Sequence, residues 1–173
     1  MKSLIESLLR EALDGIKCHK INITQEIFDE VNKFNTDEEL LRSGGISIGA
    51  LDRAAFGFAA DDIKTLMPKQ LYIKWKDDFM NVEYEQVHSK LSPHDYAIKI
   101  SLEEPIDVIY EKDRFYIDDG HHRFYAAKVL NKPLKVNLEI KENPIVKLSP
   151  SLDYDDFHRC VFKQVKEMAT RLD

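Results

Sequence analysis

The sequence predicts an α+β protein, with a small mixed sheet and packed helices between an N-terminal helical region and a C-terminal helix. Apolar residues recur at helical spacing towards both ends, and strand-like runs alternate with short helices in the middle. Of the 173 residues, 43% are apolar, which is enough for a proper core. We expect a helical region over 1–60, a mixed α/β core over 61–148 and a C-terminal helix over 149–173 that packs on that core.

Helical patterns open the chain. Ser3 is a possible N-cap of a first helix whose apolar face comprises Leu4, Ile5, Leu8, Leu9, Ala12, Leu13 and Ile16. Thr24 begins a second helix with Ile27, Phe28 and Val31 on one face. Thr36 caps a short third helix in the stretch TDEELLRS.

A glycine-dense segment, Ser43-Gly44-Gly45-Ile46-Ser47-Ile48-Gly49, follows these helices. It lacks the G-K-[ST] ending of a phosphate-binding loop, so a hinge or turn is the favoured interpretation and a phosphate cradle the alternative. The next segment, LDRAAFGFAADD, is predicted to pack between the two regions. Lining of a cleft by Asp52, Arg53, Phe56 and Phe58 is the alternative.

The middle of the chain carries the strands. QLYIKW reads as a strand after Met67-Pro68, and a hairpin with arms Ile106–Tyr110 and Arg114–Ile117 surrounds a polar turn. Between them, helices are predicted on both sides of Ser92-Pro93, with Ser92 as a cap. HHRFYAAKVL reads as a helix that stops at Asn131, and LKVNLEI as a strand. The tail is a helix with Phe157, Val161, Val165 and Met168 on one stripe.

Charge and composition exclude several classes of protein. Lys and Arg total 25 against 31 Asp and Glu, a net charge of −6, which argues against a charge-driven nucleic-acid binder. Charged residues interrupt the N-terminus, so it does not read as a signal peptide, and no apolar run is long enough to span a bilayer. We therefore expect a soluble, cytoplasmic protein with no membrane partner, and ordinary reduced thiols at Cys18 and Cys160.

The residues richest in chemistry are Asp118-Asp119-Gly120-His121-His122-Arg123, where a predicted strand meets a predicted helix. The first amides of a helix lack acceptors and carry partial positive charge, so they attract anions. Gly120 permits a sharp bend and a close approach by a ligand, and Arg123 can grip a phosphate. His121 and His122 can move protons, and Asp118 and Asp119 can cap the helix, bind magnesium or orient a hydroxyl. The pattern favours a phosphate-bearing ligand.

Each of these residues also has a purely structural interpretation. Asp119 can serve only as the helix cap, and Arg123 can pair with a surface carboxylate. Adjacent helical residues point about 100° apart, so His121 and His122 cannot share one face, which argues against a histidine-pair metal site. Tyr72, Lys74, Trp75 and Lys76 interleave rings with cations as single-strand binders do, but an ordinary solvated strand is the favoured interpretation.

The run PIDVIYEKDRFYIDDGHHRFYAAKVLNKPLKVNLEI resembles the core of the ParB/sulfiredoxin-like superfamily, in which a strand leads through D-G-H-H-R into a helix and then another strand. The preceding segment, Leu66-Met67-Pro68-Lys69-Gln70-Leu71, is similar to the first strand of that superfamily and to its L-x-P-x-x-L turn. Sulfiredoxins carry a cysteine where this chain has His121, and ParB proteins bind CTP with a G-E-R-R-type loop. The D-G-H-H-R form is more similar to the free serine kinases and to small NTPase-like or nuclease-like members.

The resemblance implies that Gly120, His121, His122 and Arg123 hold the phosphates of ATP or a related nucleotide. It also implies that Asp119 serves the acceptor or Mg²⁺, with Asp118 as a second candidate metal ligand. We expect a nucleotide-binding protein, an ATP/ADP-dependent phosphotransferase or an NTPase, with Asp119, His121 and His122 as catalytic candidates. Its partners would be the nucleotide and a small-molecule or protein phosphoacceptor. The alternatives are a non-catalytic protein-interaction module and a ParB-like DNA-binding regulator or nuclease.

Overall fold

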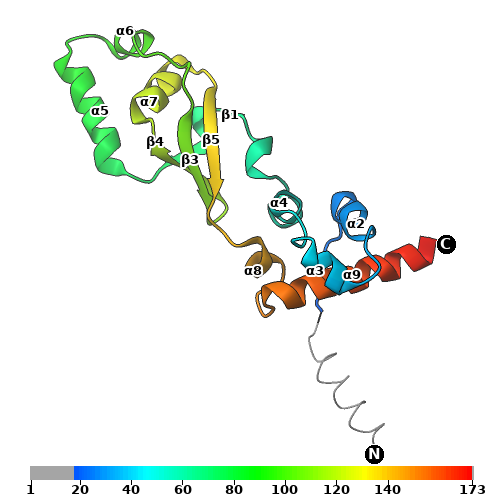
Figure 1. Ribbon diagram of the computed structural model, residues 1–173. Helices are drawn as coiled ribbons and strands as arrows, with labels where there is room; N and C mark the ends of the chain where they lie inside the picture. The colour runs from blue at the N-terminus through cyan, green and yellow to red at the C-terminus, as the bar shows by residue number, and fades with distance from the viewer. Residues whose placement is uncertain (1–17, 173) are drawn as a thin grey trace, which may run out of the picture. The chain divides into compact units, whose positions relative to one another are not determined.

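The computed structural model describes residues 18–172, which form two compact units (Figure 1). The sheet unit is Ala59–Glu142, and the helical unit combines residues 18–58 with 143–172. Together they contain helices and a five-stranded mixed sheet, which confirms the α+β class. The predicted first helix, over residues 3–16, lies outside the described residues.

The helical unit consists of two stretches of the chain, one before and one after the sheet unit in the sequence. Local signals place its helix starts: the Thr24 hydroxyl accepts from the Ile27 amide at 3.3 Å, and the Thr36 hydroxyl from the Glu39 amide at 3.2 Å. A turn with φ of +104° at Gly44 and +78° at Gly45 then leads towards α4, as the interpretation of a hinge or turn predicted. The elements are α2 (Gln25–Val31), α3 (Asp37–Arg42), α4 (Ile48–Phe56), α8 (Pro144–Leu148) and α9 (Tyr154–Leu172).

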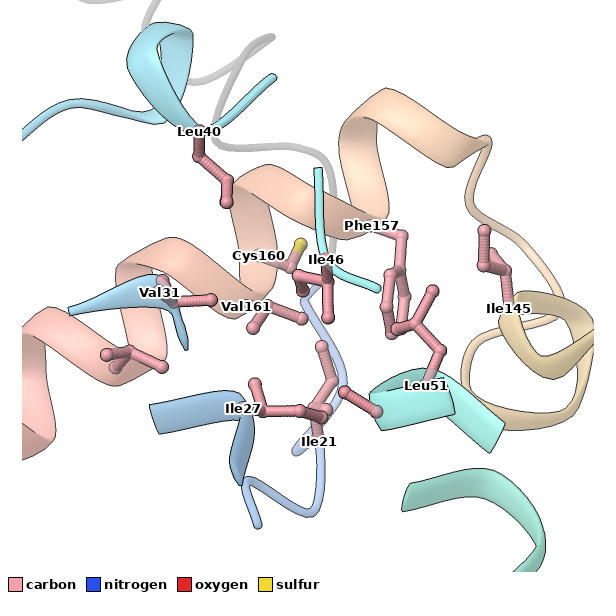
Figure 2. Packing of buried hydrophobic residues seen from close by; sticks show 12 residues of the cluster. Ile21, Ile27, Val31, Leu40, Ile46, Leu51, Ile145, Phe157, Cys160 and Val161 are labelled. Carbon is pink, nitrogen blue, oxygen red and sulfur yellow. The ribbon is translucent and has the colours of Figure 1, made fainter. Parts of the chain in front are cut away.

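One apolar core holds these helices together (Figure 2). Phe157 and Val161 of α9 pack with Ile27 and Val31 of α2 and with Leu40 of α3. The buried stripe of α9 therefore belongs to the helical unit, which corrects the expectation that the C-terminal helix packs on the α/β core. A stripe of apolar residues predicts that a helix has a buried face, but it does not identify the surface that covers that face.

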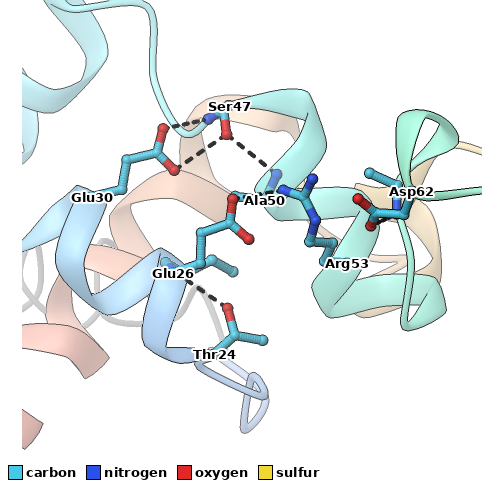
Figure 3. Close-up of polar contacts among 9 residues, drawn as sticks. Thr24, Glu26, Glu30, Ser47, Ala50, Arg53 and Asp62 are labelled. Carbon is cyan, nitrogen blue, oxygen red and sulfur yellow. Dashed lines mark hydrogen bonds and ion pairs between the residues drawn. The ribbon is translucent and has the colours of Figure 1, made fainter.

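Polar contacts connect α2 with α4 in the same unit (Figure 3). The Ser47 hydroxyl caps α4 by accepting from the Ala50 amide, while Glu30 accepts from the Ser47 amide at 3.1 Å. Arg53 reaches Glu26 at 2.7 Å. Arg53 thus joins two helices of the helical unit, and the packing of its segment between the two regions stays a prediction.

Cys18 and Cys160 form a disulfide with a Cα–Cα distance of 5.4 Å. Next to it, the side chain of Gln164 accepts from the Ile21 amide and donates to the His19 carbonyl, both at 3.1 Å. The expectation of two reduced thiols was wrong. A separation of 142 residues contains no local pairing signal, and only the packing of α9 brings the two cysteines together.

The sheet unit is a five-stranded sheet in the order β1-β5-β3-β4-β2. Strands β3 and β4 form the predicted antiparallel hairpin, with β5 parallel to β3 and β2 parallel to β4. The unit also contains two 3₁₀ turns, η1 (Ala60–Asp62) and η2 (Pro68–Gln70). Its strands are β1 (Thr65–Leu66), β2 (Leu71–Ile73), β3 (Ile106–Glu111), β4 (Arg114–Asp119) and β5 (Leu134–Ile140).

Three helices complete the sheet unit: α5 (Lys76–His88), α6 (Pro93–Ile98) and α7 (His121–Leu130). Phe124 and Ala127 of α7 share a core with Ile106, Val108 and Ile117 of the sheet. Both α5 and α6 pack against α7, and the Phe79 ring of α5 lies 5.7 Å from that of Phe124. This places α5 beside the start of α7. Among residues 18–172, no helix has the length and apolar character needed to cross a membrane.

Candidate functional site

The junction between β4 and α7 depends on a glycine. Gly120 is the N-cap of α7 and has a φ of +101°, in the left-handed region that side chains disfavour. A Cβ atom placed there would lie 2.8 Å from the Cβ of Ile106 on the neighbouring strand. The bend and the close approach of Ile106 both require glycine at this position. Gly120 therefore allows β4 to lead directly into α7.

The N-terminus of α7 has no side-chain cap. The ordinary capping residues, Ser, Thr, Asp and Asn, accept a hydrogen bond from a first-turn amide, whereas Gly120 has no atom to do so. Asp119 therefore does not act as the N-cap. The first-turn amides keep their capacity to bind an anion.

The two adjacent histidines have different surroundings, as their spacing on a helix predicted. His121 is 8% exposed, and its Nε2 has no hydrogen-bond partner within residues 18–172. His122 is exposed, and its Nε2 lies 2.7 Å from Oε2 of Glu85 on α5. Tyr96 of α6 donates to the same carboxylate oxygen at 3.3 Å.

Arg123 binds a backbone carbonyl rather than a surface carboxylate. Its Nη1 donates to the Pro105 carbonyl at 2.6 Å. Because a guanidinium has five N–H donors, this bond leaves others to bind a ligand. The contact positions Arg123 between the first turn of α7 and the segment that enters β3.

A pocket of about 750 Å³ opens at this corner of the sheet unit. Its wall combines the start of α7, one face of α5 and the segment that follows α6. Its lining residues are Asp78, Asn81, Val82, Glu85, Ile100, Ser101, Glu103, Glu104, Asp119, Gly120, His121, His122 and Arg123. The sequence predicted Asp119 to Arg123 as one site, and the structure brings all five to this pocket.

Carboxylates dominate the lining of the pocket. Five of them, Asp78, Glu85, Glu103, Glu104 and Asp119, face one guanidinium and two histidines. Glu103 also pairs with Lys135 at 3.6 Å, and Glu85 with His122. A bare polyphosphate would meet repulsion here, and a divalent cation on the phosphates would reduce that repulsion.

The structure separates the two candidate metal ligands. Asp119 lines the pocket, whereas Oδ1 of Asp118 accepts from Nε1 of Trp75 at 3.2 Å and Asp118 does not line it. Successive residues of a strand point to opposite faces of the sheet, so these neighbours do not converge. Within the described chain, no group of three or more His, Cys, Asp or Glu is arranged to hold a metal. Mg²⁺ commonly binds one or two carboxylates together with phosphates, a role that Asp119 fits.

Sequence reasoning missed the contribution of α5. Asp78, Val82 and Glu85 recur at helical spacing, so they lie on one side of α5 and all line the pocket. The sequence spacing could have predicted that these three residues share one face of the helix. That this face lies opposite α7 depends on long-range packing, such as the contact of Phe79 with Phe124.

The alternating rings and cations in and after β2 are largely engaged within the chain. Lys74 pairs with Glu111 at 2.7 Å and lies 5.5 Å from the ring of Trp75. The Trp75 indole donates to Asp118. The interpretation as an ordinary strand holds for Leu71–Ile73 only, because Lys74 and Trp75 follow β2 and Lys76 begins α5.

Comparison with protein-family models, with curated proteins and with solved structures gives no match.

Proposed function

We propose that this chain binds ATP or a related nucleotide, together with Mg²⁺, in the pocket at the start of α7. In this proposal the sheet unit is a variant of the ParB/sulfiredoxin-like fold, and the protein is a phosphotransferase or a nucleotide hydrolase. The amides of the first turn of α7 and the Arg123 guanidinium bind the phosphates. Asp119 supplies a carboxylate to the Mg²⁺ or orients the acceptor.

One observation carries the proposal: an uncapped helix N-terminus lines a pocket large enough for a nucleotide. Gly120 leaves the first-turn amides without a side-chain acceptor, and the pocket measures about 750 Å³. Small-molecule sites commonly enclose about 300–1,000 Å³. The buried His121 Nε2 adds a polar atom that has no partner among the described residues.

The carboxylates that line the pocket favour a ligand that brings a cation with it. A bound Mg²⁺ would offset the negative charge of the carboxylates and the phosphates, so nucleotide binding should require the metal. Asp119 is the candidate ligand that both lines the pocket and adjoins the first turn of α7. A nucleotide added with a chelator should not bind.

Thermal melting with ATP, ADP and CTP, each with and without Mg²⁺, tests the proposal. A nucleotide present at about one hundred times its Kd should stabilise the folded state by about 2.7 kcal/mol. We expect a rise in Tm that needs Mg²⁺ and is lost in Arg123→Ala. No rise with any of the three nucleotides, in a protein that melts cooperatively, would refute the proposal.

Arg114→Ala is the matched control. Arg114 belongs to the same unit, does not line the pocket, and lies 4.6 Å from the Tyr72 ring. Arg114→Ala removes the same charge as Arg123→Ala, so a general effect of charge would weaken nucleotide binding equally in both variants. The melting temperatures without nucleotide show whether either variant changes the fold itself.

A second candidate function, protein interaction, rests on the outer face of α5. Met80, Tyr84 and Val87 are each more than 60% exposed and recur at helical spacing. Exposed apolar side chains that gather on one face are typical of interaction surfaces. The same nucleotide titration decides between the candidates, because a protein that binds no nucleotide leaves this face as its candidate site.

A further inference from the structure

His122 and Glu85 form a pair across two helices at the edge of the pocket. Nε2 of His122 lies 2.7 Å from Oε2 of Glu85, and Tyr96 donates to that same oxygen. The side chains of His122 and Glu85 are 52% and 55% exposed, and both line the pocket. The pair is therefore accessible to water and to a bound ligand.

The hydrogen bonds determine which nitrogen of His122 can accept a proton. The hydrogen bond that His122 donates lowers the pKa of Glu85, so this carboxyl is ionised near neutral pH. A carboxylate only accepts hydrogen bonds, so Nε2 of His122 carries a hydrogen and Nδ1 carries the lone pair. Burial, followed by the charge of Glu85, raises the pKa of Tyr96, which keeps its hydroxyl as a donor.

We propose that His122 is the general base of a nucleotide hydrolysis reaction and that Glu85 is its positioning residue. This inference rests on the proposed function. A carboxylate that holds an imidazole in one tautomer stabilises the imidazolium that forms when a proton is transferred. The D-G-H-H-R segment supplies the base, and Glu85 of α5 supplies the carboxylate that orients it.

In the reaction, a water oxygen forms a bond to the γ-phosphorus of ATP while Nδ1 of His122 accepts a proton from that water. The bond between the γ-phosphorus and the β–γ bridging oxygen breaks, and its electron pair leaves on ADP. The proton on Nδ1 then passes to solvent, which restores the neutral imidazole. Phosphate and ADP are the products.

A purely structural interpretation of the pair makes a different prediction. Exposed ion pairs contribute little to stability, so a structural pair would leave the turnover rate nearly unchanged when its charge is removed. A general base commonly contributes 10²–10⁴-fold to a rate. The two interpretations therefore differ in kcat rather than in stability.

The decisive experiment measures the release of ADP and phosphate from Mg-ATP by the full chain. Glu85→Gln keeps the shape of the side chain and an acceptor oxygen but removes the charge. We expect kcat to fall at least about tenfold while KM and the nucleotide Kd stay within about twofold. Glu83→Gln is the matched control, because Glu83 is an exposed carboxylate on the same helix that does not line the pocket.

Chemical rescue tests the base itself. His122→Ala should lose turnover, and added imidazole should restore part of it, whereas His94→Ala should behave as wild type because His94 is exposed and does not line the pocket. A kcat unchanged in Glu85→Gln, or a folded His122→Ala that imidazole does not rescue, would overturn the inference alone. Wild type that binds Mg-ATP without hydrolysing it would do the same and leave nucleotide binding intact. Wild type that binds no nucleotide would overturn the proposed function as well.

Discussion

His158 is a fully buried histidine with both ring nitrogens engaged. Its Nε2 accepts from the Ile46 amide at 2.9 Å, and its Nδ1 donates to the Tyr154 carbonyl at 2.8 Å. This pattern fits only the neutral imidazole, because a protonated ring has no acceptor. Desolvation by burial correspondingly lowers the pKa of His158 from its usual 6.5.

The buried His158 makes the stability of the helical unit depend on pH. Because the pKa is lower in the folded than in the unfolded state, the stabilisation is complete above pH 6.5 and declines as the pH falls below it. Urea unfolding between pH 8 and pH 5 should show a decline of at most about 1.4 kcal/mol per pH unit from this one proton.

His158→Gln should remove that part of the pH dependence, because glutamine does not titrate. His94→Gln is the control, since His94 is exposed and should leave the slope unchanged. Equal slopes for wild type and His158→Gln would contradict the prediction.

Among the secondary-structure elements, the connection from β4 to α7 is the most constrained. Gly120 combines a φ of +101° with the close approach of Ile106. Gly120→Ala should lower the free energy of unfolding of the sheet unit by about 2–4 kcal/mol, from backbone strain together with overpacking. Chemical denaturation followed by hydrogen exchange in the sheet unit measures this loss.

Gly57→Ala separates the two causes. Gly57 ends α4 with a φ of +87°, but nothing lies within 4 Å of the position its Cβ would take. This variant should lower the free energy of unfolding of the helical unit by only about 1 kcal/mol, because only the strain of the left-handed backbone is added. A similar loss in both variants would show that the contact with Ile106 is unimportant.

Local signals predicted most of the elements. Thr24, Thr36 and Ser92 cap helices as expected, and the polar turn between the arms of the hairpin has positive φ at Lys112 and Asp113. Periodicity predicted neither of the short elements β1 and α8, and only the resemblance indicated a strand that begins near Leu66. Two residues of strand and five of helix carry too little periodicity to detect.

Only the contiguous part of the candidate site could be predicted from the sequence. The D-G-H-H-R segment is contiguous, so its residue types and its place between a strand and a helix identified it directly. Glu85 reaches His122 from α5, and Tyr96 of α6 donates to Glu85. Contacts of this kind depend on tertiary packing, which spacing within one segment does not encode. The assignment of α9 to the helical unit was missed for the same reason.

The molecule consists of two units with separate cores, and one covalent bond closes the helical unit. The Cys18–Cys160 disulfide joins the segment before α2 to α9, and Ile21 packs into the core close by. A cross-link between distant residues stabilises the folded state mainly by restricting the unfolded chain.

Reduction of the disulfide should therefore destabilise the helical unit and leave the sheet unit unchanged. The chain-entropy model attributes about 4–5 kcal/mol to a loop of this length. Hydrogen exchange with and without a dithiol reductant, resolved for each unit, measures the difference. Cys18→Ser should match the reduced protein and should not respond to reductant. Equal protection of the helical unit before and after reduction would contradict this prediction.

The division of the helical unit into two stretches of chain affects how the protein is made. The sheet unit is one continuous stretch, Ala59–Glu142, so it can fold as soon as that stretch has left the ribosome. Helices α2 to α4 emerge earlier but must wait for α9 to cover their apolar faces. The region synthesised first is therefore completed last, and until then its exposed apolar side chains are open to chaperones.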